Sequence, residues 1–205
     1  MSRKSSYADL IEHWLEQQPG PEEFVRLAEA VHTGCVRHDE VVTGFQYGLR
    51  VLRVGLLRFP SSLRLLHEFA FYASMADNND AEALLLAAWR RRRDFVSLFL
   101  LRVLFHCNPD GLSDEELFTL VITNLPSWDK PYVSLAVQAK KRGDFRTAID
   151  FYKAALAAHE SPGDYPDKSF FLSSDEIASV KRWQREAEIR IGDAGVLQGE
   201  EDEKH

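Results

Sequence analysis

The fold is decided by residues 131–161, which read PYVSLAVQAKKRGDFRTAIDFYKAALAAHES. Apolar residues recur at helical spacing on both sides of a turn at Arg142-Gly143-Asp144, which predicts two helices joined by a short connection. Small residues alternate with large ones in both helices: Ala136, Ala148 and Ala155 with Tyr132, Leu135, Phe145, Tyr152 and Leu156. That alternation allows close packing and leaves an apolar face for another helix pair. A unit of this kind rarely occurs alone, so we expect further helix pairs in the chain.

The rest of the sequence carries mostly helical signals, with Pro, Gly, Asn and Asp at the breaks. In all, about ten helices and no strand are expected. Those outside the 131–161 pair are expected near residues 6–18, 21–36, 40–59, 63–75, 80–92, 95–106, 113–121 and 173–191. Three of them begin with a serine followed three residues later by an acid, as in a capping box: Ser6 with Asp9, Ser113 with Glu116, and Ser173 with Glu176.

Two segments allow alternatives. Phe95–His106 is apolar almost all round, which is typical of a buried helix, although its Val and Phe content would also suit a strand. Its place between helical pairs favours a helix.

Phe170 and Phe171 follow a loop rich in Pro, Gly and Asp, and two adjacent rings on an extended backbone cannot both be buried easily. Either one ring lies under the last helix, or the pair forms an exposed contact site.

Composition restricts the class of protein. The chain has 205 residues, of which 45% are hydrophobic, so it can bury a core. No apolar run reaches the roughly 18 residues of a membrane helix, and acidic residues interrupt the N-terminal region early, so neither membrane insertion nor a secretory signal is expected. The two cysteines, Cys35 and Cys107, do not suggest a disulfide framework. We therefore expect a cytoplasmic protein.

Charge is distributed unevenly along the chain. The net charge is −7, but residues 41–106 carry nine basic and five acidic groups, whereas residues 1–40 and 107–205 are net acidic. The basic groups of the central block are all arginines, which suit planar recognition of carboxylate or phosphate. They are Arg50, Arg53, Arg58, Arg64, Arg90, Arg91, Arg92, Arg93 and Arg102. Residues 193–205 are expected to be a flexible acidic tail.

The 131–161 pair resembles a tetratricopeptide repeat, a helix-turn-helix unit of about 34 residues. The resemblance is carried by Tyr132, Leu135 and Ala136 in the first helix, by the turn Gly143-Asp144-Phe145, and by Ala148, Tyr152, Ala155 and Leu156 in the second. Ala139 stands where the family usually has an aromatic residue, and Pro162 falls two residues later than the family's closing proline. A weaker match to a second helix lies upstream, at Gly48, Leu52, Gly55, Leu56 and Pro60.

This resemblance implies an all-α, right-handed α-α superhelix over a single domain of residues 1–192. It also implies a concave surface that binds peptides or helices of other proteins. The first-helix residues expected to face that groove are Lys130, Val133, Ser134, Val137, Lys140 and Lys141. One branch of the family grips a C-terminal carboxylate through Lys, Asn and Arg. Ser134 and Val137 occupy places where polar clamp residues would be needed, so no such clamp is predicted.

The run Arg90-Arg91-Arg92-Arg93 has three interpretations. Consecutive residues are 100° apart on a helix, so the four spread around it and can pair locally or complement the helix dipole. They can also bind an acidic segment of a partner protein. Phosphate or nucleic acid is the third interpretation, and it is disfavoured because an acidic protein without a broad lysine-rich face binds polyanions poorly.

Catalytic signals are weak. His32, Cys35 and His38 have ligand chemistry, but the two histidines lie about 9 Å apart along a helix, and a zinc site needs a fourth ligand. No nucleophile motif, phosphate loop or dinucleotide fingerprint occurs. We therefore expect no enzyme activity, metal or cofactor.

The expected function is a non-catalytic adaptor, scaffold or chaperone-like subunit that binds an acidic or amphipathic segment of another protein. The arginines at 90–93 and the first-helix residues given above would form the contact. The alternatives are a regulatory module that binds nucleic acid or another anionic ligand, a self-assembling subunit, and a metalloenzyme that uses His32 and Cys35.

Overall fold

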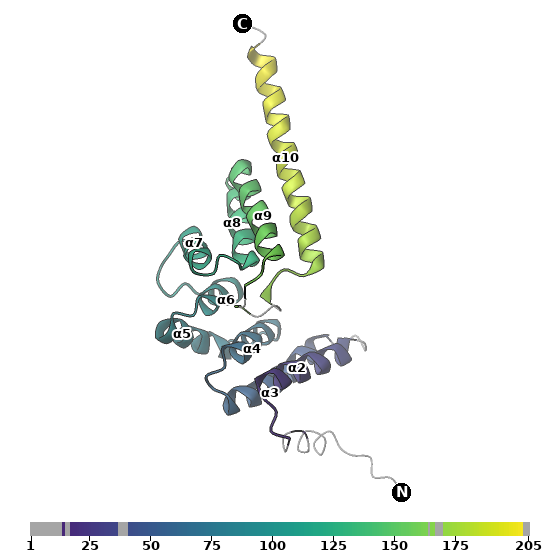
Figure 1. Cartoon of the computed structure of the whole chain (residues 1–205), viewed down its shortest axis with the longest axis vertical. Coiled ribbons are helices and arrows are strands. Elements are labelled where there is room, and N and C mark those ends of the chain that lie inside the picture. The colour runs from purple at the N-terminus through teal and green to yellow at the C-terminus, as the bar shows by residue number, and fades with distance from the viewer. Residues whose placement is uncertain (1–13, 15–16, 37–40, 164, 167–169, 203–205) are drawn as a thin grey trace. The chain divides into compact units, whose positions relative to one another are not determined.

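The computed structural model describes residues 14, 17–36, 41–163, 165–166 and 170–202. Within these ranges the chain forms nine helices and no strand, so the all-α prediction is confirmed (Figure 1). The helices are α2 (Pro21–Val36), α3 (Val41–Arg58), α4 (Leu63–Met75), α5 (Asp80–Arg92), α6 (Phe95–Phe105), α7 (Asp114–Asn124), α8 (Asp129–Lys141), α9 (Phe145–Glu160) and α10 (Ser174–Asp202). The predicted capping box at Ser6 and Asp9 lies outside the described residues. None of the helices in the described part has the length and apolar character needed to cross a membrane.

The chain divides into two compact units, Met1–Cys107 and Asn108–His205. Unit 1 contains α2 to α6, in which each helix packs on the next and α4 also contacts α2 and α6. α4 is therefore the central helix of unit 1, and most of its residues are buried. The prediction that residues 1–192 form a single repeat domain stays a prediction.

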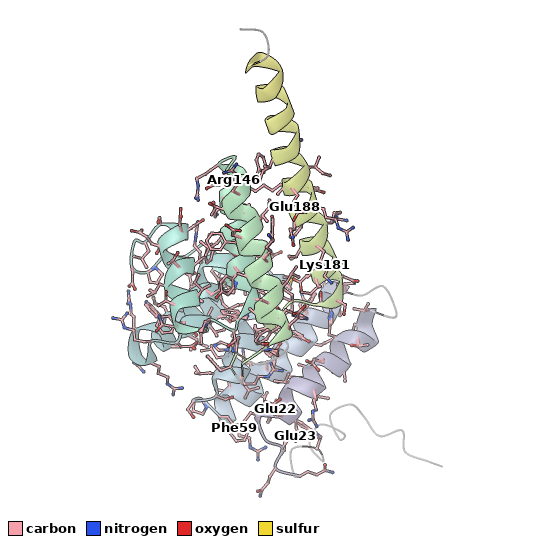
Figure 2. The ribbon with its side chains drawn as sticks, turned by 45° about the horizontal axis from the view of Figure 1, so that its top comes forward. Glu22, Glu23, Phe59, Arg146, Lys181 and Glu188 are labelled. Atoms are coloured by element: carbon pink, nitrogen blue, oxygen red, sulfur yellow. The ribbon has the colours of Figure 1, made fainter. Side chains whose placement is uncertain are left out.

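Glycines set the distance between α3 and its neighbours. A Cβ atom added at Gly48 would lie 2.3 Å from Cε1 of Tyr72 in α4, and one at Gly55 would lie 2.9 Å from Cγ of Phe24 in α2. Phe24 also packs edge-on against Phe59, just after α3, with ring centroids 6.2 Å apart. The first turn of α2 and the end of α3 therefore lie at the same end of unit 1, where Figure 2 labels Phe59.

The apolar segment Phe95–His106, for which the sequence allows both a helix and a strand, forms helix α6, so the alternative of a strand is wrong. Asp94 precedes α6 as its N-cap and accepts a hydrogen bond from the backbone N–H of Ser97 at 2.9 Å. Six residues of the helix, Val96 to Leu101, are buried. The local cap and burial on several sides explain why this apolar run is helical.

Unit 2 is built on the predicted helix pair. α8 and α9 pack together, with α7 against α8 and α10 against α9. Gly143 has φ +80°, and Asp144 caps α9 by accepting from the Thr147 N–H at 3.1 Å, so the turn is made as predicted. Ala136 and Ala148 are fully buried in the core that α8 and α9 share with α10. The close-packing prediction is thus confirmed, whereas the repeat type and the superhelix remain predictions.

The last helix, α10, is longer than predicted. Ser173 and Glu176 form the expected reciprocal bonds at its start, at 2.7 and 3.3 Å. Trp183 is half-buried and packs against the core, 6.3 Å from the ring of Tyr152. The helical backbone continues past the predicted end near Ile191 to Asp202, into the segment predicted to be a flexible tail.

Phe170 and Phe171 are both buried, each 7% exposed, which corrects both interpretations of this loop. Both rings can be buried because the backbone is not extended here: the chain bends at these two residues. The carbonyl of Phe170 accepts a hydrogen bond from the indole N–H of Trp128 at 2.9 Å, which fixes the bend against the start of α8.

Candidate functional site

An apolar groove with a volume of about 490 Å³ lies between α3, the start of α4 and α5 in unit 1. We call it the α3–α5 groove. Its apolar lining consists of Leu56, Leu57, Pro60, Leu63, Leu66, Phe69, Leu84, Ala87 and Ala88. Its polar lining consists of Arg53, Ser61, Ser62, Asp80, Arg91 and Arg92. The volume lies within the range of about 300–1,000 Å³ that is usual for ligand pockets.

Two leucines of the groove are unusually exposed. Leu57 on α3 is 80% exposed and Leu84 on α5 is 46% exposed, so both present apolar surface to solvent. Sequence reasoning missed them because it considered only the buried face of each helix. The available signal was that Leu57 is five residues after the buried Leu52, about 140° around the helix.

Arginines from two helices border this apolar surface. Arg53 on α3 forms an ion pair with Asp80 at the start of α5, and its guanidinium lies 6.0 Å from the ring centroid of Phe69. Arg92 donates to the carbonyl of Ser61 at 2.8 Å, while Arg91 is exposed. The groove therefore combines an apolar floor with a cationic rim, and it contains one acidic side chain.

The four consecutive arginines, Arg90–Arg93, do not form one patch, as helical geometry predicts. Arg91 and Arg92 line the groove, whereas Arg90 does not. Arg93 leaves the helix in a left-handed conformation with φ +52°, and its guanidinium lies 4.8 Å from the ring centroid of Trp89. The run thus supplies two groove residues and one helix cap.

Arg90 lies close enough to Cys107 to affect its ionisation. Burial raises the pKa of the Cys107 thiol above its usual value of about 9, and the side chain of Glu82 raises it further. The positive charge of Arg90 acts in the opposite direction. Arg90 thus lies near Cys107 and is not among the residues that line the groove.

Several of the predicted binding residues of α8 contact α10. Lys130 forms an ion pair with Glu176 at 3.7 Å, and Lys140 forms one with Glu186 at 3.1 Å. Val133 packs against the core cluster that includes residues of α10. This side of α8 is thus turned toward another helix of the same unit. The remaining residues predicted to bind are half-buried or exposed: Ser134, Val137 and Lys141.

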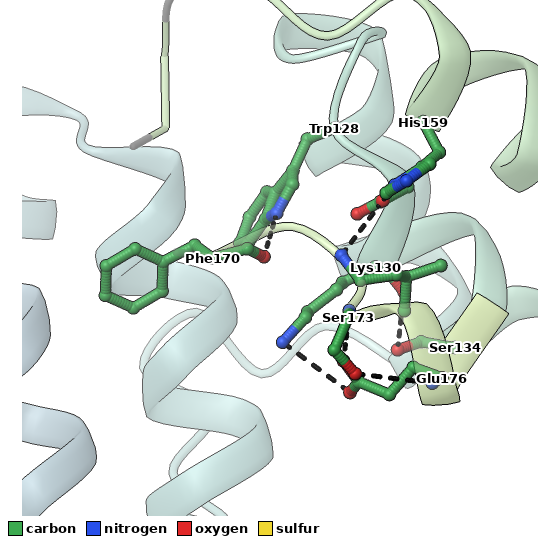
Figure 3. A network of polar contacts seen from close by, with 9 residues as sticks. Trp128, Lys130, Ser134, His159, Phe170, Ser173 and Glu176 are labelled. Atoms are coloured by element: carbon green, nitrogen blue, oxygen red, sulfur yellow. Dashed lines mark hydrogen bonds and ion pairs between the residues drawn. The ribbon is translucent and has the colours of Figure 1, made fainter. Parts of the chain in front are cut away.

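Sequence reasoning missed a buried polar cluster at the start of α8 (Figure 3). Asp129 is fully buried, and its Oδ2 accepts hydrogen bonds from Nδ1 of His159 at 2.8 Å and from the backbone N–H of Leu172 at 3.0 Å. Together with the Trp128 bond, these contacts tie α8, α9 and the loop before α10. Nothing in the sequence marks Asp129, since an acid in a first helical turn is ordinary.

A second buried cluster contains the residue types of a catalytic triad but not their arrangement. Asp94 and Ser97 contact the same ring nitrogen of His67, Nε2, at 2.8 and 3.4 Å. A triad requires the serine and the acid on opposite ring nitrogens. All three side chains are buried, so the cluster joins α6 to α4 and is not open to a substrate.

The proposed metal ligands are not brought together in the described part of the chain. No group of three or more His, Cys, Asp or Glu side chains with metal-binding geometry occurs among the described residues, and His38 lies outside them. His32 packs against Phe45 with ring centroids 4.1 Å apart, and Cys35 is a free thiol.

Comparison with known proteins found no match, whether to a protein-family model, to a curated protein or to a solved structure. A second cavity, of about 450 Å³, is lined by Lys140, Phe145, Glu186, Ile189 and Arg190, and its Lys140 and Glu186 already pair with each other. The α3–α5 groove has the larger apolar lining, with nine apolar residues against two.

Proposed function

We propose that this chain is a non-catalytic adaptor, scaffold or chaperone-like subunit that binds a segment of a partner protein in the α3–α5 groove. The observation that carries the proposal is the apolar surface of this groove, with Leu57 80% exposed, beside arginines from two helices. Exposed apolar surface bordered by polar groups is typical of protein-binding sites.

The proposal also includes a tetratricopeptide-like architecture, which the close packing of α8 and α9 supports. Within that architecture, the main contact is placed on unit 1 rather than on α8. The reason is that Lys130 and Lys140 already pair with acidic side chains of α10. Ser134, Val137 and Lys141 remain as candidate residues for a second contact.

Site-specific photo-cross-linking in cells tests this function. Leu57 is replaced by a photoreactive amino acid, and the matched control carries the same group at Val42, which is 61% exposed on the same helix and does not line the groove. We expect one discrete cross-linked protein from position 57 that is not obtained from position 42. Equal cross-linking at both positions, or none at position 57, would contradict the proposal.

A further inference from the structure

We propose that the occupant of the α3–α5 groove is an acidic amphipathic helix of a partner protein. In the free protein, the carboxylate of Asp80 occupies the position beside Arg53 that a carboxylate of the partner would take. This inference rests on the proposed function and specifies its partner. Its three elements are the apolar floor, the arginine rim and the internal ion pair.

The shape of the groove suits a helix. Asp80, Leu84, Ala87 and Arg91 follow one another at helical spacing along the groove side of α5, which has 13 residues and is therefore about 20 Å long. A partner helix of about three to four turns would match this length. Its apolar side chains, repeating every three or four residues, would contact Leu57 and the other apolar residues of the groove.

The charges favour acidic flanks on that helix. Arg53 lies on the α3 side of the groove and Arg91 on the α5 side, so carboxylates on both flanks of a bound helix would meet a guanidinium. Arginine binds carboxylate through paired N–H groups. The surrounding block of residues 41–106 is net +4 in an otherwise acidic chain, which attracts an acidic partner and repels a basic one.

Asp80 already makes the interaction that a partner carboxylate would make. Its carboxylate pairs with Arg53, and the two side chains are 60% and 50% exposed. An ion pair this exposed is weak and exchanges readily with a competing carboxylate. Arg53 would keep its position during the exchange because its guanidinium also lies over Phe69. Asp80 would therefore lower the affinity of the groove for any acidic ligand, so that ligands with few other contacts would not bind.

Designed peptides and the full chain provide the test. The probe is a helical 14-residue peptide with leucines every three or four residues and glutamates on both flanks. Two further peptides carry lysine or glutamine at the glutamate positions. Binding is measured by fluorescence anisotropy at low salt, and circular dichroism checks that each protein variant is folded.

The protein variants separate the groove from its surroundings. Arg91→Glu reverses a charge in the groove, whereas Arg90→Glu makes the same change one residue earlier, outside it. We expect Arg91→Glu to weaken binding of the glutamate peptide about 10-fold or more and to strengthen binding of the lysine peptide, while Arg90→Glu changes either by less than about 2-fold. Asp80→Asn should strengthen binding of the glutamate peptide about 2- to 5-fold.

The outcomes distinguish this inference from the proposed function. If the lysine or glutamine peptide binds the wild type as tightly as the glutamate peptide, the acidic partner is refuted while the groove remains a binding site. Weaker binding by Asp80→Asn overturns the role given to Asp80. A concentration-dependent dimer that Arg91→Glu dissociates in sedimentation experiments would replace the partner with a second copy of the chain. If no peptide binds and no cross-link forms at Leu57, both proposals fail.

Discussion

Replacing Gly48 by alanine tests the packing that positions the α3–α5 groove. The added Cβ would lie 2.3 Å from Cε1 and 2.6 Å from Cδ1 of Tyr72. Non-bonded carbon atoms normally approach to about 3.5–4.0 Å, so the ring or the helix has to move by about 1 Å. α3 would then shift relative to α4, and both helices line the groove.

The Tyr72 ring has little room to move. It is 4% exposed, and it packs edge-on against His32 and Phe45 with centroid distances of 5.9 and 5.3 Å. Overpacking of this kind costs about 1–3 kcal/mol, and a displacement near 1 Å places the cost toward the upper end. Alanine recovers about 1 kcal/mol of helix propensity relative to glycine. We therefore expect Gly48→Ala to lower the free energy of unfolding by about 1–2 kcal/mol.

Gly34→Ala in α2 is the matched control, because a Cβ at Gly34 meets no atom within 4 Å. There the propensity gain is unopposed, and the free energy of unfolding should rise by about 0.5–1 kcal/mol. Urea unfolding followed by far-ultraviolet circular dichroism measures both, with the denaturant slopes compared between variants. If Gly48→Ala is as stable as Gly34→Ala, the close approach of α3 to α4 is wrong.

Three further predictions concern polar groups. Asp129→Asn removes a buried negative charge that accepts two hydrogen bonds, so urea unfolding should show a loss of about 1.5–3 kcal/mol. Hydrogen bonds from Ser113, the capping-box serine, lower the pKa of Glu116 below its ordinary value of about 4.5. The Glu116 carboxylate therefore stabilises the fold above pH 4.5, and this stabilisation is lost as the pH falls through the lowered pKa. The stability difference between wild type and Glu116→Gln should accordingly shrink between neutral pH and about pH 3, and a gap that does not depend on pH would refute this explanation. In a Cys35→Ser background, Glu82→Gln should lower the pKa of Cys107 and speed its alkylation by iodoacetamide near pH 8. An unchanged alkylation rate would contradict the contact between Glu82 and Cys107.

Much of the secondary structure could be predicted because its signals are local. The capping box at Ser113 and Glu116 is present, and α5 spans the predicted residues 80–92. The turn at Gly143 forms where the spacing placed it. Each of these features depends on a few residues close together in the chain, so the sequence carries the information directly.

The candidate site could be predicted only in part. The sequence indicated an arginine-rich centre, and helical spacing indicated that Arg90–Arg93 would not form one patch. It could not show that Arg91 lines a groove with Leu57, because that pairing depends on how α5 packs against α3. It also could not show that Lys130 and Lys140 would meet α10, since those contacts join residues 46 positions apart.

By itself, the sequence determined that this protein is helical, where most of its helices begin and end, and which helix pair packs through alanines. Only the tertiary structure decided which side chains share a surface, which charges are paired, and that Phe170 and Phe171 are both buried. The physical reason is that helix formation and capping act over three or four residues, whereas burial and pairing depend on segments brought together by folding. The α3–α5 groove belongs to the second class, because its apolar floor and its arginines come from three different segments.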